Sequence, residues 1–414
     1  MSNRNLPLTV CLILCFTFIL NLNALGQMTL GQYEDEAPLR TWNTFGLPLA
    51  QSLGLGGAQF ALAEGPSSAL TNPALLSKLP KFSVSLSGSL SSASLFRYSI
   101  INTGVLSTEK NSTISMYVAD FGGVSLNMNG WAIAASLSLV EIYDRPKIAW
   151  DYTYRGSPYY SIKFTQDGFL KNANFSISRR ITHGLAVGIG LNYLFGEYEK
   201  TVNEEWIYTQ ITITDKKSHK YKGFYINGGI VADLTEKLSV AAVFRSPCKK
   251  EAQSESSLQY LSPMGDTYIT INAEADNTYS LPLVLGLGMS YRFSSEFRAA
   301  SDVSFFNWSS YSIDYFEEDL ARDFRDIVKI SAGVEYLSFF QLFGQDMKAP
   351  FRFGFQYDPQ PMHNPDSYYL YLSFGTGIYW GNFRLDAGAN IGKEYGSGND
   401  LSATRMVITI GYQQ

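Results

Sequence analysis

The chain has 414 residues, of which 45% are hydrophobic, 14% aromatic and only 17% charged, with a net charge of -5. About a quarter of the residues of a typical soluble protein are charged, so this composition argues against a soluble multi-domain enzyme. The negative charge, without any basic block, argues against a nucleic-acid partner. Low charge with 27 Tyr and 27 Phe is typical of a β-barrel whose strands alternate lipid-facing and lumen-facing residues.

Residues 1–26 have the pattern of a secretory signal peptide. Arg4 gives a basic start, Leu6 to Leu22 is apolar, and Ala24-Leu25-Gly26 is a small-x-small cleavage site. We expect the mature chain to begin at Gln27. The alternative is an uncleaved anchor helix, which the well-formed cleavage flank disfavours. After cleavage Cys248 is the only cysteine, so neither an intramolecular disulfide nor a zinc set is expected.

Residues 27–81 lack strand alternation and predict helices and turns. The segment is apolar and rich in glycine, as in Gly54-Leu55-Gly56-Gly57-Ala58, and later contains Asn72-Pro73-Ala74-Leu75-Leu76. A loose periplasmic tail would carry more charge. We therefore expect this segment to fold into the lumen of the barrel as a hatch or plug, ahead of a barrel formed by residues 82–414.

Period-two alternation dominates the rest of the chain. No second apolar run of helical length follows, so a membrane-resident chain must close its backbone hydrogen bonds in a barrel. From Tyr279 to Phe293 the odd positions are apolar and the even positions small or polar. The sequence predicts an all-β, antiparallel outer-membrane barrel of about 14 strands. They are expected to begin near Phe82, Thr113, Trp131, Lys171, Leu185, His219, Lys237, Tyr279, Phe297, Ile327, Pro350, Ser367, Phe383 and Thr404.

The predicted connections alternate in length. Those after even-numbered strands are short, with one longer exception from Ser338 to Ala349. Those after odd-numbered strands are long and polar, notably Glu141–Leu170, Glu197–Lys217 and Ser246–Thr278. Short turns on one side and long loops on the other are typical of the periplasmic and extracellular ends of an outer-membrane barrel.

Several motifs, in chain order, resemble the FadL/TodX family of outer-membrane hydrophobic-compound transporters. The stretch from Gly56 to Ala63 leads into Asn72-Pro73-Ala74, which resembles the Asn-Pro-Ala of the family's hatch. The matches in the C-terminal half are Leu281-Pro282, Ala300-Ser301-Asp302-Val303, Asn307-Trp308-Ser309, Phe351-Arg352-Phe353-Gly354-Phe355 and Phe374-Gly375-Thr376-Gly377. Residues 91–167 depart from the family pattern, which leaves open whether the family's lateral exit, at a kink in the third strand, exists here.

The resemblance implies passive uptake of hydrophobic small molecules, such as long-chain fatty acids or aromatic hydrocarbons. Ligand would be captured by extracellular loops, pass a lumen pocket and be released sideways when the hatch moves. A similar glycine-rich stretch before Asn-Pro-Ala also opens barrels linked to protein secretion. A barrel that serves protein secretion or surface attachment is therefore the alternative, and a general porin is disfavoured by the plug.

The candidate site residues fall into three groups. The hatch group is Asn72, Pro73 and Ala74, in which Asn caps a turn and Pro fixes it, either to gate the pore or only to cap. Exposed apolar residues in two long loops suggest a capture groove, or a lid of loops packed on one another; they are Trp206, Tyr208, Tyr260, Leu261 and Met264. Strand parity places Arg298, Lys329, Arg352 and Arg384 in the lumen, paired with either a ligand carboxylate or lumen carboxylates.

Enzyme chemistry finds no support in the motifs. The three histidines, His183, His219 and His363, are far apart, and no catalytic triad, metal-ligand spacing, Walker loop or dinucleotide motif is present. We expect a protein without enzymatic activity, cofactor or metal. It should be a monomer in the bacterial outer membrane, where it contacts lipid, lipopolysaccharide and a hydrophobic small-molecule ligand.

Overall fold

The computed structural model describes residues 39–40, 45–94, 113–154, 156–262, 267–315, 318–321, 324–342, 344–364, 366–397 and 401–414. The predicted signal peptide lies outside these residues. The helices are α2 (Ala50–Gly54), η2 (Gly65–Ser67), α3 (Ser68–Thr71), η3 (Pro73–Lys78) and η5 (Trp308–Ser310). In the described part of the chain, every helix is too short or too polar to cross a bilayer.

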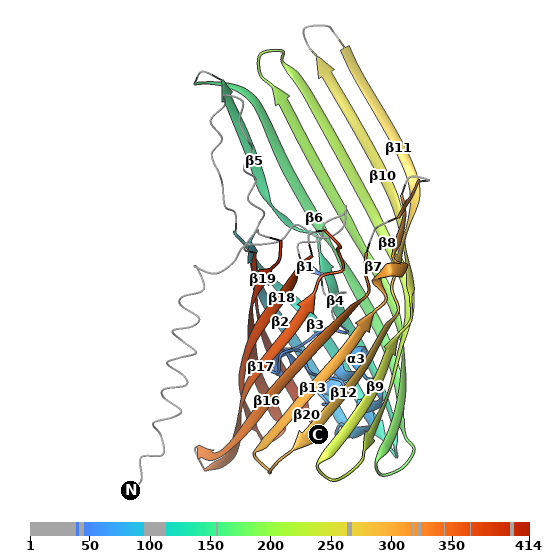
Figure 1. Cartoon of the computed structure of the whole chain (residues 1–414), viewed down its shortest axis with the longest axis vertical. Coiled ribbons are helices and arrows are strands. Elements are labelled where there is room, and N and C mark those ends of the chain that lie inside the picture. Colours follow the sequence, from blue (N-terminus) through green and yellow to red (C-terminus); the bar gives the residue numbers. More distant parts are fainter. Residues whose placement is uncertain are drawn as a thin grey trace.

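One antiparallel sheet contains all the described strands and curls into a barrel (Figure 1). The first ten strands are β1 (Leu39–Arg40), β2 (Phe82–Ser94), β3 (Thr113–Met128), β4 (Trp131–Ile142), β5 (Arg145–Tyr154), β6 (Ser157–Arg180), β7 (Leu185–Trp206), β8 (Ile211–Asp233), β9 (Leu238–Arg245) and β10 (Cys248–Ser262). The others are β11 (Thr267–Leu281), β12 (Val284–Arg292), β13 (Phe297–Phe306), β14 (Ser312–Tyr315), β15 (Glu318–Ala321), β16 (Ile327–Leu342), β17 (Gln345–Pro359), β18 (Tyr368–Trp380), β19 (Phe383–Tyr395) and β20 (Ser402–Gln413).

The barrel closes where the first long strand meets the last. β2 pairs with β20 from Ser83 to Ala93 and with β3 on its other side. The described strands occupy fourteen positions around the barrel, because β9 and β10 share one position, as do β11 and β12. Each of these two positions is interrupted by a proline, Pro247 or Pro282, which cannot donate to the ladder. The predicted all-β outer-membrane barrel of about fourteen strands is confirmed.

Burial follows the predicted alternation. On β12 the side chains of Leu285, Leu287 and Met289 are 45%, 66% and 48% exposed, whereas those at Val284, Gly286 and Gly288 are buried. A soluble sheet would bury its apolar face, so this inverted pattern gives a lipid-facing outer wall.

The turns at one end of the barrel agree with the short connections expected from the sequence. β3 and β4 are joined by Asn129-Gly130, both with positive φ (51° and 84°), as a two-residue hairpin turn requires. The one expected exception, Ser338–Ala349, was wrong: β16 runs to Leu342 and β17 begins at Gln345. The C-terminus lies at this same end (Figure 1).

The three long polar loops were also predicted wrongly. β6, β7, β8, β10 and β11 continue through Glu141–Leu170, Glu197–Lys217 and Ser246–Thr278 as paired strands, and β5 adds to the edge of β6. Outside the bilayer the outward side chains no longer need to be apolar, so the alternation that marks a membrane strand fades although the backbone ladder continues. For the same reason the predicted starts at Lys171, His219 and Tyr279 fall inside longer strands.

Candidate functional site: the hatch, the lumen and a break in the wall

Residues 45–81 fill the lumen, where α2 contacts β17 to β20 and η3 contacts β6 to β8 on the opposite side (Figure 1). Asn72, which is fully buried, begins η3: its side-chain oxygen accepts a hydrogen bond from Ala74 N at 3.1 Å, and Pro73 follows as the first helical residue. Its amide nitrogen donates to Phe60 O at 2.8 Å. Asn72 therefore both caps η3 and joins two parts of the hatch.

Barrel side chains hold the hatch by its backbone. Asp302 on β13 accepts hydrogen bonds from Gln59 N at 2.6 Å and Phe60 N at 3.0 Å. Across the lumen, the Asn227 side chain donates to Ala69 O at 2.9 Å, and further bonds reach Ala74, Ser77, Leu79 and Pro48. These contacts anchor residues 48–80, and a large displacement of that part would leave many buried polar groups unpaired.

Glycines on the lumen face let the hatch backbone lie directly on the strands. A Cβ at Gly333 of β16 would come within 2.6 Å of Leu55 Cα, and a Cβ at Gly354 of β17 would overlap the backbone of Leu55 and Gly56. Gly188 of β7 is matched in the same way to Pro73 and Ala74. The hatch is thus fitted to the barrel at several points around the wall.

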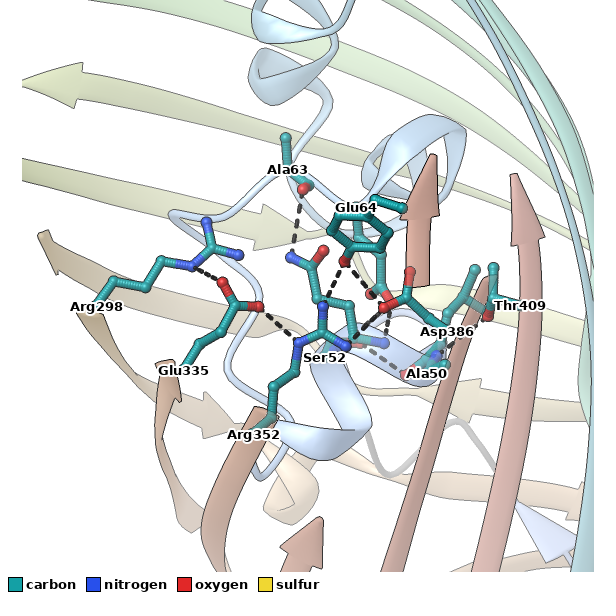
Figure 2. A network of polar contacts seen from close by, with 12 residues as sticks. Ala50, Ser52, Ala63, Glu64, Arg298, Glu335, Arg352, Asp386 and Thr409 are labelled. Atoms are coloured by element: carbon teal, nitrogen blue, oxygen red, sulfur yellow. Dashed lines mark hydrogen bonds and ion pairs between the residues drawn. The ribbon is translucent and has the colours of Figure 1, made fainter. Parts of the chain in front are cut away.

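Glu64 is the buried acid of the hatch. Its carboxylate accepts hydrogen bonds from Gln51 N at 2.6 Å and Ser52 N at 3.2 Å, at the start of α2 (Figure 2). Burial raises the pKa of the Glu64 carboxyl from its usual 4.5 to about 7, and the hydrogen bonds from Ser52 offset this only in part. Ionisation of Glu64 is therefore disfavoured in the folded state.

We expect Glu64→Gln to remove a pH dependence of stability. A carboxyl whose pKa rises on folding contributes stability that is fully present below pH 4.5 and is lost as the pH rises through about 7. The variant should therefore gain in thermal transition temperature relative to the parent between pH 4.5 and pH 8, measured in detergent. Parallel pH profiles for the two proteins would contradict this assignment.

Arg352 lies at the centre of a buried polar network (Figure 2). Its side chain has no solvent exposure and binds Glu335 through Nε and Asp386 through Nη1, both at 2.7 Å. It also donates to the Tyr379 hydroxyl at 2.5 Å, and Arg298 pairs with the other oxygen of Glu335 at 2.8 Å. The predicted lumen residues Arg298 and Arg352 therefore come together, and lumen carboxylates already satisfy them.

The other two predicted lumen cations differ in environment. Lys329 is buried and pairs with Asp358 at 2.5 Å. Arg384 lies near the periplasmic end of β19, half-buried, with its guanidinium 5.0 Å from the centre of the Tyr379 ring. Lys329 and Arg352 therefore both pair with lumen carboxylates, which is one of the two alternatives that the sequence left open.

The upper lumen holds a second cluster, made mostly of tyrosines. Tyr143 packs against Tyr198 and Tyr221, with ring centroids 5.3 Å and 5.5 Å apart. The Lys250 ammonium lies 4.5 Å from the ring centre of Tyr221 and 4.6 Å from that of Tyr279. The cluster packs one side of the lumen above the hatch, and the sequence analysis did not predict it.

In the part of the chain that the structure describes, the barrel wall is broken between β3 and β4. β4 pairs with β3 only from Phe121 to Met128, so among the described residues the β4-facing edge of β3 from Thr113 to Asp120 has no strand partner. Val140 forms a bulge against β6 just above the last β3–β4 pair. Beyond it, β4 pairs with the short β1 in place of β3. The third barrel strand thus leaves its neighbour, as the family resemblance would require of a lateral exit.

A small cavity lies at the base of this break. It has a volume of about 20 Å³ and is lined by Gly46, Leu47, Leu70, Ser138, Leu139, Val140, Asn172, Tyr225 and Arg245. This volume accommodates about one water molecule, so a hydrophobic ligand can enter only if the walls move. One wall belongs to β4 and another to Gly46 and Leu47, at the start of the described hatch.

The predicted capture residues do not line one groove. Trp206 and Tyr260 point to the face of the extracellular hairpins that continues the lumen, Leu261 points to the opposite face, and Tyr208 lies in the turn between β7 and β8. Met264 lies outside the described residues. The sequence misled here because it gives which residues are apolar but not the strand register that assigns them to a face.

Tyr379 and Glu64 are among the site residues that the sequence analysis missed. Tyr379 has the lumen-facing parity of Ser373 and Gly375 on β18, so the period-two pattern would have found it. Nothing in the sequence marks Glu64, since a single glutamate between two turns is usually exposed.

Comparisons with known proteins agree on the fold. A family model described as BamG matches residues 62–404, whereas no curated protein matches the chain in sequence.

A Pseudomonas aeruginosa FadL homologue of solved structure has a TM-score of 0.64 at 13% identity, covering 89% of this chain and 99% of that one. The Ralstonia pickettii toluene transporter TbuX has a TM-score of 0.59 at 16% identity, covering 90% and 100%. The Pseudomonas putida toluene transporter TodX has a TM-score of 0.59 at 14% identity, covering 89% and 98%. The resemblance to FadL and TodX is thus confirmed at the level of the fold, and TbuX and TodX are described as transporters rather than enzymes.

Proposed function

The chain belongs to the BamG family, and from the geometry of its hatch and wall we propose that it passes hydrophobic small molecules sideways from the lumen into the outer membrane. The observation that carries the proposal is the break between β3 and β4, which has a small cavity at its base. The hatch, anchored from residue 48 to residue 80, closes the direct path to the periplasm. A lateral path avoids both the hatch and a passage of the apolar ligand through water.

Gating would fall to the start of the described hatch, which lines the cavity. Gly46 and Leu47 form one wall of the cavity, and Pro48, the next residue, accepts a hydrogen bond from Arg405 of β20. Their displacement would enlarge the cavity toward the gap while Asn72 to Ala74 stay seated. The proposed gate thus lies upstream of the Asn-Pro-Ala motif, whose described contacts are those of a cap.

The ligand class that fits this lumen is uncharged and apolar. A fatty-acid carboxylate would need a cation. The buried lumen cations Arg352 and Lys329 already bind carboxylates, and Arg245, which lines the cavity, lies over the rings of Phe45 and Phe306. Aromatic hydrocarbons make no such demand, and TbuX and TodX are named as toluene transporters. We therefore place monoaromatic hydrocarbons before long-chain fatty acids.

The test is uptake of radiolabelled toluene and radiolabelled oleate by cells that make this protein in place of their own hydrophobic-compound channels. We expect toluene uptake to rise with the parent protein and to fall at least tenfold with Val140→Trp, because the indole would fill the base of the gap. Val303→Trp, on the lipid-facing side of β13, is the matched control and should leave uptake unchanged. A folded, heat-modifiable barrel that supports uptake of neither compound would refute the proposal.

A further inference from the structure

The cavity at the base of the break has a polar wall that the passage of a plain hydrocarbon would not use. Ser138 of β4 forms the last pair with β3, at Phe121, and on its other side it lies opposite Asn172 of β6. Side chains directly opposite each other on one face of an antiparallel pair are roughly 5 Å apart. Ser138 and Asn172 both line the cavity and are only 4% and 1% exposed. Two buried polar side chains therefore meet at the cavity.

Ser138 brings a hydroxyl group without a partner. In the part of the chain that the structure describes, Ser138 Oγ makes no hydrogen bond. A buried hydroxyl in a folded protein is normally hydrogen-bonded, and each exception calls for a physical reason. An unpaired hydroxyl at the wall of a cavity indicates that a polar group can bind there.

Asn172 brings a hydrogen-bond acceptor whose direction is fixed by a chain of amides. The chain begins at Ala69 O of the hatch, which can only accept, so Asn227 turns its Nδ2 toward it at 2.9 Å. Asn227 Oδ1 then accepts from Asn192 Nδ2 at 2.7 Å. Asn192 Oδ1 in turn accepts from Asn172 Nδ2 at 2.9 Å. The hatch thus determines which end of the Asn172 amide is left over.

The group left over is the Asn172 carbonyl. Asn172 Nδ2 also donates to the Tyr225 hydroxyl, another lining group, at 3.1 Å. Asn172 Oδ1 is buried and, among the described residues, has no hydrogen-bond partner. Rotating the amide by half a turn would break both of these bonds, so the acceptor keeps its place. The cavity therefore combines one fixed acceptor with the Ser138 hydroxyl, which can donate or accept.

A neutral hydroxyl group is the ligand group that complements this pair. Its O–H donates to Asn172 Oδ1, and its oxygen accepts from the Ser138 hydroxyl. The volume of about 20 Å³ accommodates a group of this size. We propose that the cavity recognises the hydroxyl group of a phenol-type compound, whose ring occupies the space opened by displacement of Gly46 and Leu47. The proposal rests on the lateral passage proposed above and names its substrate class as monoaromatic compounds that carry one neutral hydroxyl.

Arg245 also lines the cavity and raises the question of an anionic ligand. Its guanidinium lies 5.8 Å from the ring centre of Phe45 and 5.9 Å from that of Phe306. An aromatic carboxylate would be attracted to this cation. It has no proton to donate to Asn172 Oδ1, however, and the two acceptors would repel each other. A neutral hydroxyl satisfies both unpaired oxygens and is the better fit.

The test is competition binding to the purified full-length barrel, in which p-cresol, 4-methylanisole or 4-methylbenzoate displaces radiolabelled toluene. p-Cresol is toluene with one added hydroxyl, and we expect its Kd to be at least tenfold lower than that of toluene. A site without these polar groups would favour toluene, because water hydrates the hydroxyl of p-cresol. 4-Methylanisole cannot donate a hydrogen bond and should bind no more tightly than toluene.

Ser138→Ala should reduce the preference for p-cresol over toluene at least threefold. Because Ser138 Oγ has no partner among the described residues, its removal should leave unfolding in urea unchanged. Ser136→Ala is the matched control. Ser136 lies two residues away on the same face of β4, and its buried Oγ is likewise unpaired in the described chain, but it is not part of the cavity lining. This variant should keep the preference of the parent.

The outcomes separate this inference from the proposed passage. Toluene binding without a preference for p-cresol would overturn the hydroxyl site and leave the passage of hydrocarbons in place. A preference that Ser138→Ala does not change would also overturn it. Tightest binding of 4-methylbenzoate would show that Arg245 selects an anion, which contradicts a neutral ligand. A folded barrel that binds none of the four compounds would refute the hydroxyl site and the proposed function together.

Discussion

Arg352→Met is expected to destabilise the barrel by about 3–5 kcal/mol, the usual effect of removing one partner from a buried ion pair. The Arg352 side chain has no solvent exposure and binds two carboxylates. Without it Glu335 keeps Arg298, but Asp386 keeps only the Tyr379 hydroxyl, at 2.9 Å. Urea unfolding of the barrel in lipid vesicles would measure the loss.

A second substitution separates this structural role from ligand binding. In Arg352→Met/Asp386→Asn the group left without Arg352 is an uncharged amide, while Glu335 keeps Arg298, so most of the lost stability should return. Arg292→Met, at the exposed periplasmic rim, should change stability by less than about 0.5 kcal/mol. If Arg352 served mainly to hold a ligand carboxylate, the Arg352→Met variant would unfold at the same urea concentration as the parent protein. It would lose only fatty-acid binding.

Gly354→Ala is expected to unseat the turn of the hatch, at a loss of about 1–3 kcal/mol for overpacking. A Cβ at this position would overlap the backbone of Leu55 and Gly56, which cannot rotate away as a side chain would. Gly56 has φ +69° and lies wedged between β16 and β17, so the turn has no room to retreat. Limited proteolysis should then cleave the hatch near this turn, while the barrel strands stay protected.

The matched control is Gly411→Ala on β20. This glycine is also buried, but a Cβ there meets Ser85 Oγ at 3.5 Å, an ordinary contact. It should leave the proteolysis pattern unchanged. The free energy of unfolding, measured in urea, should stay within about 0.5 kcal/mol of the parent value. Equal behaviour of the two variants would mean that the hatch is held loosely, and the gate would then not be restricted to residues before Pro48.

The barrel combines a filled lumen with an opening in its described wall. The hatch and the tyrosine cluster fill the described lumen, and the break between β3 and β4 interrupts the wall formed by the described strands. The break serves the proposed lateral passage, which the uptake experiment tests.

The sequence by itself determined the kind of protein. Alternation such as that of Leu285, Leu287 and Met289 against small residues requires an apolar outer wall, because each strand has a side-chain period of two. Lumen parity likewise placed Arg298 and Arg352 inside. The strand count and the short turns followed from the same pattern, since each turn interrupts the alternation.

Only the tertiary structure decided how the pieces meet. Whether Arg352 faces a ligand or Glu335 and Asp386 depends on the register of four strands, β16 to β19, and local sequence carries no information on register. The extracellular strands were hidden for a related reason: their ladders depend on neighbours in space, while their outer side chains are as polar as those of loops. The fit of Gly354 to the hatch backbone and the break beside Val140 come from contacts between residues far apart in the chain, which only the closed barrel brings together.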